Sequence, residues 1–303
     1  MDPFADWYDA AGVRAGIRRT FADERDHAKV FFPASLVPYL EHDLVRERAP
    51  GQCETLTVRH LYQFLIATTH LETRVVNRGA ERIANDRIGV PVDAQLRMDA
   101  FKVYCDEGYH SLYSLDLARQ VEAATGITVP DWDFGGFADR LDATAARLLP
   151  GAAVLAQLLQ VVVFETLITA VLNELPADPT VMTTVRDLAR DHARDEGRHH
   201  RYFAGFFRHL WTHLDAPTRA RAAVALPELI EDCLRWDGGP VRRSLVLAGL
   251  SGAEADVVVD DCYGGVPQMR QTASATVRLC RSTGVLDEPG AWEAFAVKGL
   301  VGE

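Results

Sequence analysis

The sequence predicts an all-α protein, and three features of its 303 residues lead to this prediction. Several long stretches carry apolar residues at the three- and four-residue spacing of an amphipathic helix. No segment shows the sustained alternation of apolar and polar residues that is typical of a β-strand. Prolines and glycines lie between the periodic stretches, where they can end one helix and begin the next. These features indicate a mainly α protein.

The first part of the chain is expected to be less regular than the part that follows. Residues 1–30 are predicted to form a polar amphipathic helix with Ile17, Phe21 and Val30 on its apolar side. Prolines interrupt the pattern after this helix, so an irregular stretch is predicted over residues 31–51.

Two long helices are predicted next. The first runs from about residue 55 to 82 and the second from 91 to 124. Gly126 then supplies the residue type that commonly follows a helix C-terminus, because glycine accepts the left-handed conformation. A loop over residues 126–136 and a short helix that ends at Pro150 complete this part of the chain.

An apolar helix is predicted over residues 152–174 and a more polar one over 178–214. Asp178-Pro179 has the pattern of a helix N-cap followed by proline at the first helical position. Shorter helices followed by a tail are predicted at residues 218–236, 240–250, 253–262 and 268–282.

Composition excludes some classes of partner and location. With 43 acidic and 32 basic residues the net charge is −11, which disfavours nucleic acid and anionic membranes as partners. Five scattered cysteines without a CxxC pair, and an N-terminus without a signal-peptide pattern, favour a cytoplasmic location. The most apolar stretch fits a buried helix better than a membrane span, because it contains Gln157, Gln160, Glu165 and Asn173.

Two segments carry nearly the same metal-binding pattern. Residues 106–110 are Asp-Glu-Gly-Tyr-His and residues 195–199 are Asp-Glu-Gly-Arg-His. On a helix, Glu-x-x-His presents one carboxylate and one imidazole to a metal from adjacent turns. His192 lies four residues before Glu196 and therefore on the same helix face. One such motif can arise by chance in an acidic chain, whereas a matched pair indicates a metal site.

A four-helix bundle that binds two irons also needs one Glu from each of its other two helices. Glu72 precedes Asp106 by 34 residues, and Glu165 precedes Asp195 by 30. Glu165 is also the single acid in the apolar run 161–168, where an unpaired carboxylate is costly unless it is protonated, paired or bound to a cation. The candidate metal ligands are Glu72, Glu107, His110, Glu165, His192, Glu196 and His199.

With these motifs the chain resembles the AurF-like p-aminobenzoate/arylamine N-oxygenases, a family of ferritin-like diiron oxygenases. That family repeats twice a Glu, a gap of about thirty residues and Asp-Glu-x-x-His, and adds a histidine at the position of His192. The resemblance covers roughly residues 30–215. It implies a ferritin-like four-helix bundle core with additional helices. We assign residues 1–303 to one domain, with the metal-binding core at about 55–215 and a helical extension at about 217–303.

The resemblance further implies two iron ions per chain and O₂ as co-substrate. Asp106 and Asp195, next to the ligand Glu residues, are expected to accept hydrogen bonds from ligand histidines. His200 points about 100° away from His199 on a helix and is not expected to be a ligand. In our hypothesis Glu107 and Glu196 bridge the irons, Glu72 and His110 serve one iron, and Glu165, His192 and His199 serve the other.

The implied activity is oxidation of an aromatic amine through hydroxylamine and nitroso stages towards a nitro group, in secondary metabolism such as antibiotic biosynthesis. The chain carries no flavin or nicotinamide fingerprint, so an external electron donor, either a reductase or a small reductant, is expected. A homodimer is left open. Inward-facing positions near the ligands could contact substrate or simply form core, and they are Phe64, Thr68, Val103, Val161, Thr169 and Leu188.

Two other functions fit the same ligands. One is a diiron oxygenase of different chemistry, such as C–H hydroxylation. The other is iron oxidation and storage, although storage ferritins are shorter bundles without the long C-terminal part. Manganese also accepts these oxygen and nitrogen ligands.

Overall fold

The computed structural model describes residues 2–21, 28–132, 134–167, 172, 174–235, 237–263 and 272–302. Within these residues the chain is helical or irregular, and the sole extended pairing is a bridge between Val30 and Val181. The all-α prediction is confirmed. No helix in the described part of the chain combines the length and apolar character needed to cross a membrane.

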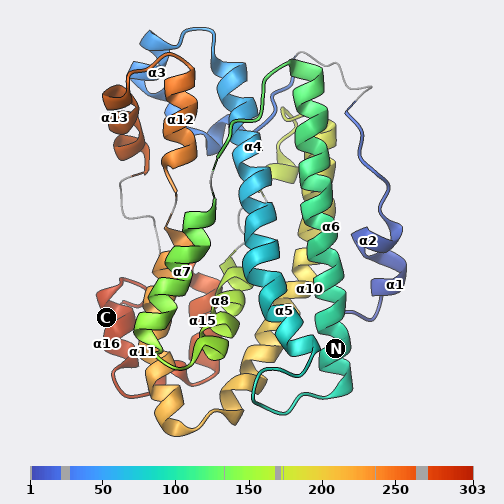
Figure 1. Cartoon of the computed structure of the whole chain (residues 1–303), viewed down its shortest axis with the longest axis vertical. Coiled ribbons are helices and arrows are strands. Elements are labelled where there is room, and N and C mark those ends of the chain that lie inside the picture. The colour runs from blue at the N-terminus through green and yellow to red at the C-terminus, as the bar shows by residue number, and fades with distance from the viewer. Residues whose placement is uncertain are drawn as a thin grey trace.

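Four long helical segments form the centre of the molecule (Figure 1). One of them is composite, and it consists of α4, the π-helical turn η3 and α5. The composite segment packs against α6, and α8 packs against α10. The two pairs are joined by contacts of α6 with α10 and of α8 with η3. The segments are α4 (Cys53–Leu71), η3 (Glu72–Val76), α5 (Asn77–Ala84), α6 (Ala94–Thr125), α8 (Ala153–Leu167) and α10 (Thr183–His213).

Local sequence explains where α6 begins and ends. The carboxylate of Asp93 accepts a hydrogen bond from the backbone N–H of Leu96 at 2.7 Å, as an N-cap does. Gly126 has φ of 71°, the left-handed conformation that glycine adopts without a Cβ clash. The predicted end of this helix is therefore confirmed.

The remaining elements pack around these four segments. Short helices α3, α12 and α13 gather at one end of the bundle, while α7, α11, α15 and α16 lie on one side of its other half (Figure 1). They are α3 (Asp43–Arg48), α7 (Gly135–Leu148), α11 (Ala216–Leu234), α12 (Gly239–Leu247), α13 (Gly252–Tyr263), α15 (Ser274–Ser282) and α16 (Ala291–Val297), with single 3₁₀ turns η1 (Ala34–Leu36), η2 (Pro38–Glu41), η4 (Leu175–Ala177) and η5 (Val285–Asp287).

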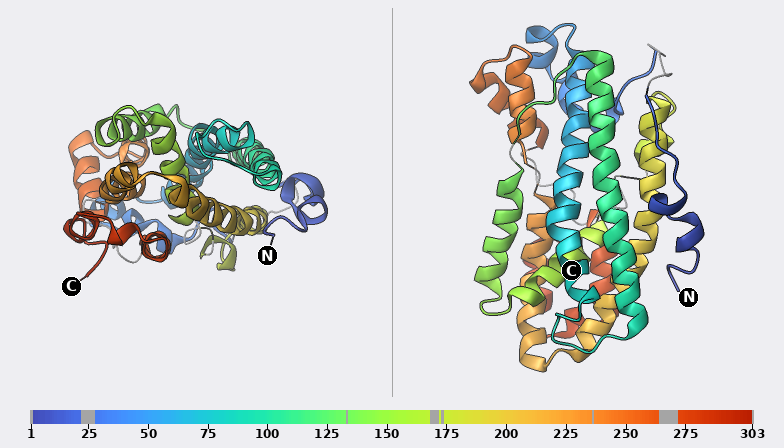
Figure 2. Two further views of the ribbon diagram at one scale, coloured as in Figure 1. Left: turned by 90° about the horizontal axis from the view of Figure 1, so that it is seen from below. Right: turned by 45° about the vertical axis from the view of Figure 1, so that its right-hand side comes forward.

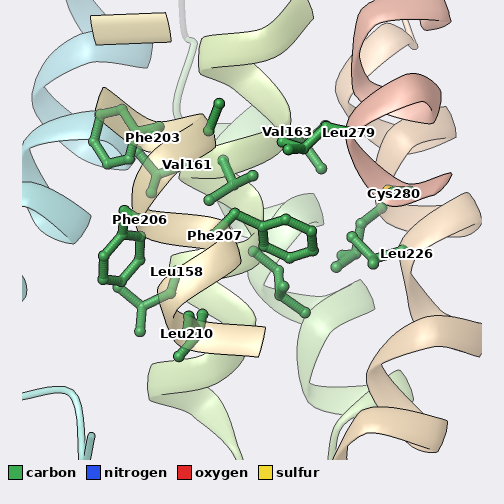
Figure 3. Close-up of a cluster of buried hydrophobic side chains, with 14 of the residues drawn as sticks. Leu158, Val161, Val163, Phe203, Phe206, Phe207, Leu210, Leu226, Leu279 and Cys280 are labelled. Carbon is green, nitrogen blue, oxygen red and sulfur yellow. The ribbon is translucent and has the colours of Figure 1, made fainter. Parts of the chain in front are cut away.

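The apolar core extends into the C-terminal helices. In Figure 3, apolar side chains of α8 and α10 lie together, with Leu226 of α11 and Leu279 of α15 beside them. The same cluster includes Phe4 near the N-terminus and Val301 near the C-terminus. A second cluster joins α4, α6 and α10 to the helices at the other end, through residues such as Leu61.

The predicted helix over residues 1–30 is wrong. Within the described residues 2–21 and 28–30, the structure has two four-residue helices, α1 (Trp7–Ala10) and α2 (Gly12–Ala15), and residues 16–21 are irregular. Tertiary burial explains the difference, because Phe4 and Trp7 turn into the core while Ile17 is 71% exposed. This N-terminal segment lies along α6 and α10 (Figure 2).

Three further boundaries differ from the sequence-based prediction. Helix α10 begins at Thr183, because Asp178 accepts a hydrogen bond from the backbone of Thr180 and thereby caps a turn instead of the helix. The predicted helix 55–82 is interrupted by η3. The predicted tail contains α16. The predicted end of the helix 152–174 and the start of the helix 268–282 lie partly outside the described residues.

Candidate metal centre

The seven side chains singled out in the sequence converge in the middle of the bundle. They come from all four long segments: Glu72 from η3, two ligands from α6, Glu165 from α8 and three from α10. Each of the seven is at most 2% exposed. The two Asp-Glu-Gly-x-His motifs face each other because α6 and α10 are in contact.

Glu72 begins the π-helical turn. Such a turn contains one more residue than an α-helical turn and changes the direction in which side chains leave the helix. The carboxylate of Glu72 lies 2.9 Å from Nε2 of His192, and it accepts a hydrogen bond from the Ser111 hydroxyl at 3.3 Å. The interruption of the predicted helix therefore falls at a candidate ligand, where π-helical turns are frequently found.

The donor atoms form two overlapping groups, within each of which all ligand atoms lie within 4.8 Å of one another. Glu196 belongs to both groups. The first group is Glu72, His110, His192 and Glu196, and the second is Glu107, Glu165, Glu196 and His199.

Glu107 also connects the two groups. Its Oε1 lies 3.1 Å from Nδ1 of His199 in the second group, and its Oε2 lies 3.2 Å from Nδ1 of His110 in the first. Glu196 has the same relation, with Oε1 at 3.2 Å from Nε2 of His192 and 3.3 Å from Nδ1 of His199. Two carboxylates thus lie between two sets of imidazoles.

The structure places His192 differently from our initial assignment. That assignment pairs it with Glu165 and His199, whereas its imidazole lies with Glu72 and His110, whose ring centroid is 4.2 Å away. Seven residues separate His192 from His199, which is a rise of about 10 Å along a helix. The two imidazoles therefore reach opposite ends of the centre, with Glu196 between them.

Asp106 and Asp195 make reciprocal contacts between the two helices. Nε2 of His199 on α10 lies 3.1 Å from Oδ2 of Asp106 on α6. In the other direction, Nε2 of His110 on α6 lies 3.3 Å from Oδ2 of Asp195 on α10. Each aspartate thus contacts the outer nitrogen of one histidine whose inner nitrogen, Nδ1, faces the carboxylate cluster.

Without a bound cation, the pKa is lowered for two of the clustered glutamates and raised for a third. Burial opposes ionisation of Glu72 and Glu196, but neighbouring imidazoles outweigh it, so the pKa of each is lowered. Glu165 differs because burial, together with repulsion from Glu196 and Glu107, raises its pKa well above the usual range. Neither oxygen of Glu165 has a hydrogen-bond partner in the described structure.

These unpartnered atoms fit a bound cation. Oε1 of Glu107 and Nδ1 of His199 are also buried without a hydrogen bond, although they lie close to each other, and both belong with Glu165 to the second donor group. Buried polar atoms are rarely left unpartnered unless something else satisfies them. Carboxylate and imidazole donors without thiolates are suited to iron or manganese.

The contacts of the candidate substrate residues with a substrate remain a prediction. Val103 and Val161 are fully buried in the first core cluster. Phe64 and Thr68 are partly buried on α4, and the Phe64 ring packs 5.8 Å from that of Phe32. Leu188 on α10 borders a cavity, whereas Thr169 lies outside the described residues.

Three residues near the centre were not expected from the sequence. Trp7 and Gly12 donate hydrogen bonds to Asp106 and Asp195, and Arg198 pairs with Asp195 at 2.6 Å. The pattern of residues 1–30 contains no signal that would bring Trp7 or Gly12 here. His200, predicted to point away, lies 3.2 Å from the backbone oxygen of Glu165.

The fold and the site together define a ferritin-like helical protein with two overlapping groups of buried carboxylates and histidines that could hold metal ions. The sequence model for p-aminobenzoate N-oxygenase AurF matches residues 20–284. The chain therefore belongs to this family of diiron N-oxygenases, as its two motifs had indicated. The match continues beyond the motifs into α11–α15. No curated protein matches the chain.

Proposed function

We propose that this protein is a diiron, O₂-dependent N-oxygenase that oxidises an aromatic amine to its hydroxylamine, nitroso or nitro product. The observation that carries the proposal is the pair of buried donor groups that share Glu196, in a chain of the N-oxygenase family. We place its pathway in secondary metabolism, and its electrons would come from a reductase or a small reductant.

The seven proposed ligands divide into two sets and a pair of shared carboxylates. The distances favour Glu107 and Glu196 as bridges, since each approaches imidazoles of both groups. The proposed set is Glu72, His110 and His192 on one iron, Glu165 and His199 on the other, and Glu107 and Glu196 between them.

Asp106 and Asp195 would select the tautomer of their histidines. A neutral imidazole carries its proton on one nitrogen, and an aspartate at Nε2 favours the proton there. Nδ1 of His110 and His199 would then be left unprotonated and could hold a metal ion. His192 presents Nε2 instead, and in the described structure no aspartate contacts it.

The charges of the centre suit a reduced iron pair. Four glutamates carry a charge that balances two ferrous ions, and a low-dielectric pocket favours such neutrality. Two irons held there would supply the reduction of O₂ and the transfer of an oxygen atom to nitrogen. The protein's own part is to hold the ligands, exclude water and position the amine.

Our candidate amine site is a cavity bordered by Tyr113, whose ring packs against His110 and His192 of the first donor group. It has a volume of about 290 Å³ and is bordered by Tyr109, Tyr113 and Leu188, which suits a single aromatic ring. The Tyr113 ring lies 5.4 Å from that of His110, and its buried hydroxyl has no hydrogen-bond partner in the described structure.

The arginines that border this cavity favour an amine without a carboxylate. Arg18 is paired with Asp116 and Arg19 with Asp191, each at 2.7 Å. A substrate carboxylate would have to compete with these aspartates. We therefore propose that neutral anilines are better substrates than aminobenzoates.

The test is product analysis after single turnover. Metal-free protein is loaded anaerobically with two equivalents of ferrous iron and mixed with ¹⁸O₂ and either aniline or 4-aminobenzoate. We expect ¹⁸O on nitrogen, with a higher yield from aniline, and no product from metal-free protein. Ring hydroxylation without N-oxidation would show an oxygenase of different chemistry. A cage that holds many irons per chain would show a storage protein.

A further inference from the structure

We propose that residues 2–16, which we call the N-terminal strap, help to orient the histidine ligands of the metal centre. In this proposal Trp7 and Gly12 are positioning residues that fix the two aspartates behind the ligand histidines. The proposal rests on the proposed function, because it takes His110 and His199 as metal ligands. The strap lies before residue 20, where the family match begins.

Trp7 holds Asp106. The indole N–H lies 2.8 Å from Oδ2 and 3.0 Å from Oδ1 of this carboxylate, and both partners are buried. Oδ2 is also the atom that contacts Nε2 of His199. An indole N–H can only donate, so it fixes the carboxylate without competing for the histidine proton.

Gly12 holds Asp195 in the equivalent way. Its backbone N–H lies 3.1 Å from Oδ2 of Asp195, the atom that contacts Nε2 of His110. A Cβ at this position would lie only 2.7 Å from the same oxygen. Glycine is therefore required for the backbone to come this close to the carboxylate.

Further contacts fasten the strap to α10. Asp6 accepts hydrogen bonds from Arg198 at 3.1 and 3.2 Å, and Arg198 itself donates to Asp195 at 2.6 Å. The Phe4 ring is 1% exposed and packs 6.2 Å from the ring of His199. The strap thus covers the outer side of both histidine–aspartate pairs, along α6 and α10 (Figure 2).

The expected consequence concerns metal affinity. Removing a group that orients a ligand histidine typically weakens metal binding by 10- to 100-fold. Trp7 and Gly12 contact the aspartates and not the histidines themselves. We therefore expect a loss of metal affinity at the lower end of this range. Because the two contacts serve different histidines, Trp7→Phe should affect one iron position and Gly12→Ala the other.

The experiment uses the full chain titrated with Co²⁺, whose absorption spectrum reports ligand geometry. Trp7→Phe keeps an aromatic ring but removes the N–H and makes the buried side chain smaller, so the thermal unfolding measurement is needed to separate the two effects. Gly12→Ala adds only the Cβ. Matched controls are Tyr8→Phe on the exposed side of the strap and Gly205→Ala on α10, where an added Cβ meets no atom within 4 Å. Thermal unfolding of each metal-free variant measures folding separately.

We expect two Co²⁺ per wild-type chain, and about tenfold weaker binding of one Co²⁺ with an altered spectrum in each strap variant. Both controls should match the wild type. Unchanged affinity and spectra in Trp7→Phe and Gly12→Ala would overturn the role of the strap and leave the metal centre standing. A wild-type chain that binds no Co²⁺ would overturn the metal centre itself.

Discussion

At the scale of single residues, the candidate centre combines side chains that have partners within the protein with Glu165, whose two carboxylate oxygens are both buried without a hydrogen bond in the described structure. Glu72 and Glu196 have imidazoles close by, and Asp106 and Asp195 accept several hydrogen bonds. Glu165 has none, and its pKa is raised by burial and by Glu196 and Glu107. The energetic cost of assembling the centre is therefore concentrated at Glu165.

Glu165→Gln should make the metal-free protein more stable at pH 7. A carboxyl whose pKa is raised on folding loses stability as pH rises from its unfolded value, about 4.3, towards its folded value. The glutamine removes this loss, and we expect a gain of about 1–3 kcal/mol in the free energy of unfolding. Urea unfolding of metal-free protein at pH 7 and pH 4 measures it, and the gain should shrink at pH 4.

The control for this prediction is Glu54→Gln on the exposed start of α4, which should change stability by less than about 0.5 kcal/mol. With metal present the order should reverse, because the variant loses a ligand of the second group. A metal-free Glu165→Gln protein that is less stable than the wild type at pH 7 would contradict our account of Glu165.

At the scale of elements, the approach of the composite helix to α8 determines the spacing of the centre. Gly79 on α5 faces Val161 on α8, and a Cβ on Gly79 would lie 2.9 Å from Cγ1 of Val161. The neighbouring turn η3 carries Glu72 and also contacts α8. A side chain at residue 79 would therefore push apart the helices that carry Glu72 and Glu165.

Gly79→Ala should destabilise the protein despite the better helix propensity of alanine. Propensity favours alanine by about 1 kcal/mol, whereas overpacking a filled core costs about 1–3 kcal/mol. We expect a net loss of stability and weaker metal binding, measured by thermal unfolding and Co²⁺ titration. Gly205→Ala, with free space around its Cβ, should be neutral or stabilising. Equal behaviour of the two variants would show that the contact with Val161 is not tight.

At the scale of the whole molecule, the C-terminal helices share the core of the bundle that carries the candidate ligands. Thr276 on α15 hydrogen-bonds Thr166 on α8 at 2.6 Å, and Phe295 on α16 is fully buried in the first core cluster. We therefore propose that residues 1–303 form one cooperative domain, in which the C-terminal part supports α8 and its Glu165.

Phe295→Ala tests this proposal, because it removes a buried ring far from the metal centre. We expect a loss of about 3–5 kcal/mol in a single unfolding transition seen alike by far-ultraviolet circular dichroism and tryptophan fluorescence. Val297→Ala, at a site 83% exposed, is the control and should have little effect. Two separate transitions, only one of them shifted, would indicate an independent C-terminal unit.

The sequence by itself determined the helical class, the long helices and the seven candidate ligands, which the structure brings together. Helical periodicity is a local property, and it places Glu107 and His110, or Glu196 and His199, on one face whatever the rest of the chain does. Glu165 was recognisable for a related reason, since a lone acid in an apolar helix requires a partner.

Only the tertiary structure decided which candidate ligands lie in the same donor group. It also decided where η3 interrupts the helix predicted over residues 55–82, and how residues 2–21 fold. His192 lies with Glu72 because the part of α10 that carries His192 packs near η3. Trp7 contacts Asp106 although 99 positions separate them in the sequence. Such contacts depend on how the helices pack against one another. Local spacing describes the face of a single helix and carries no information about the neighbour that this face will meet.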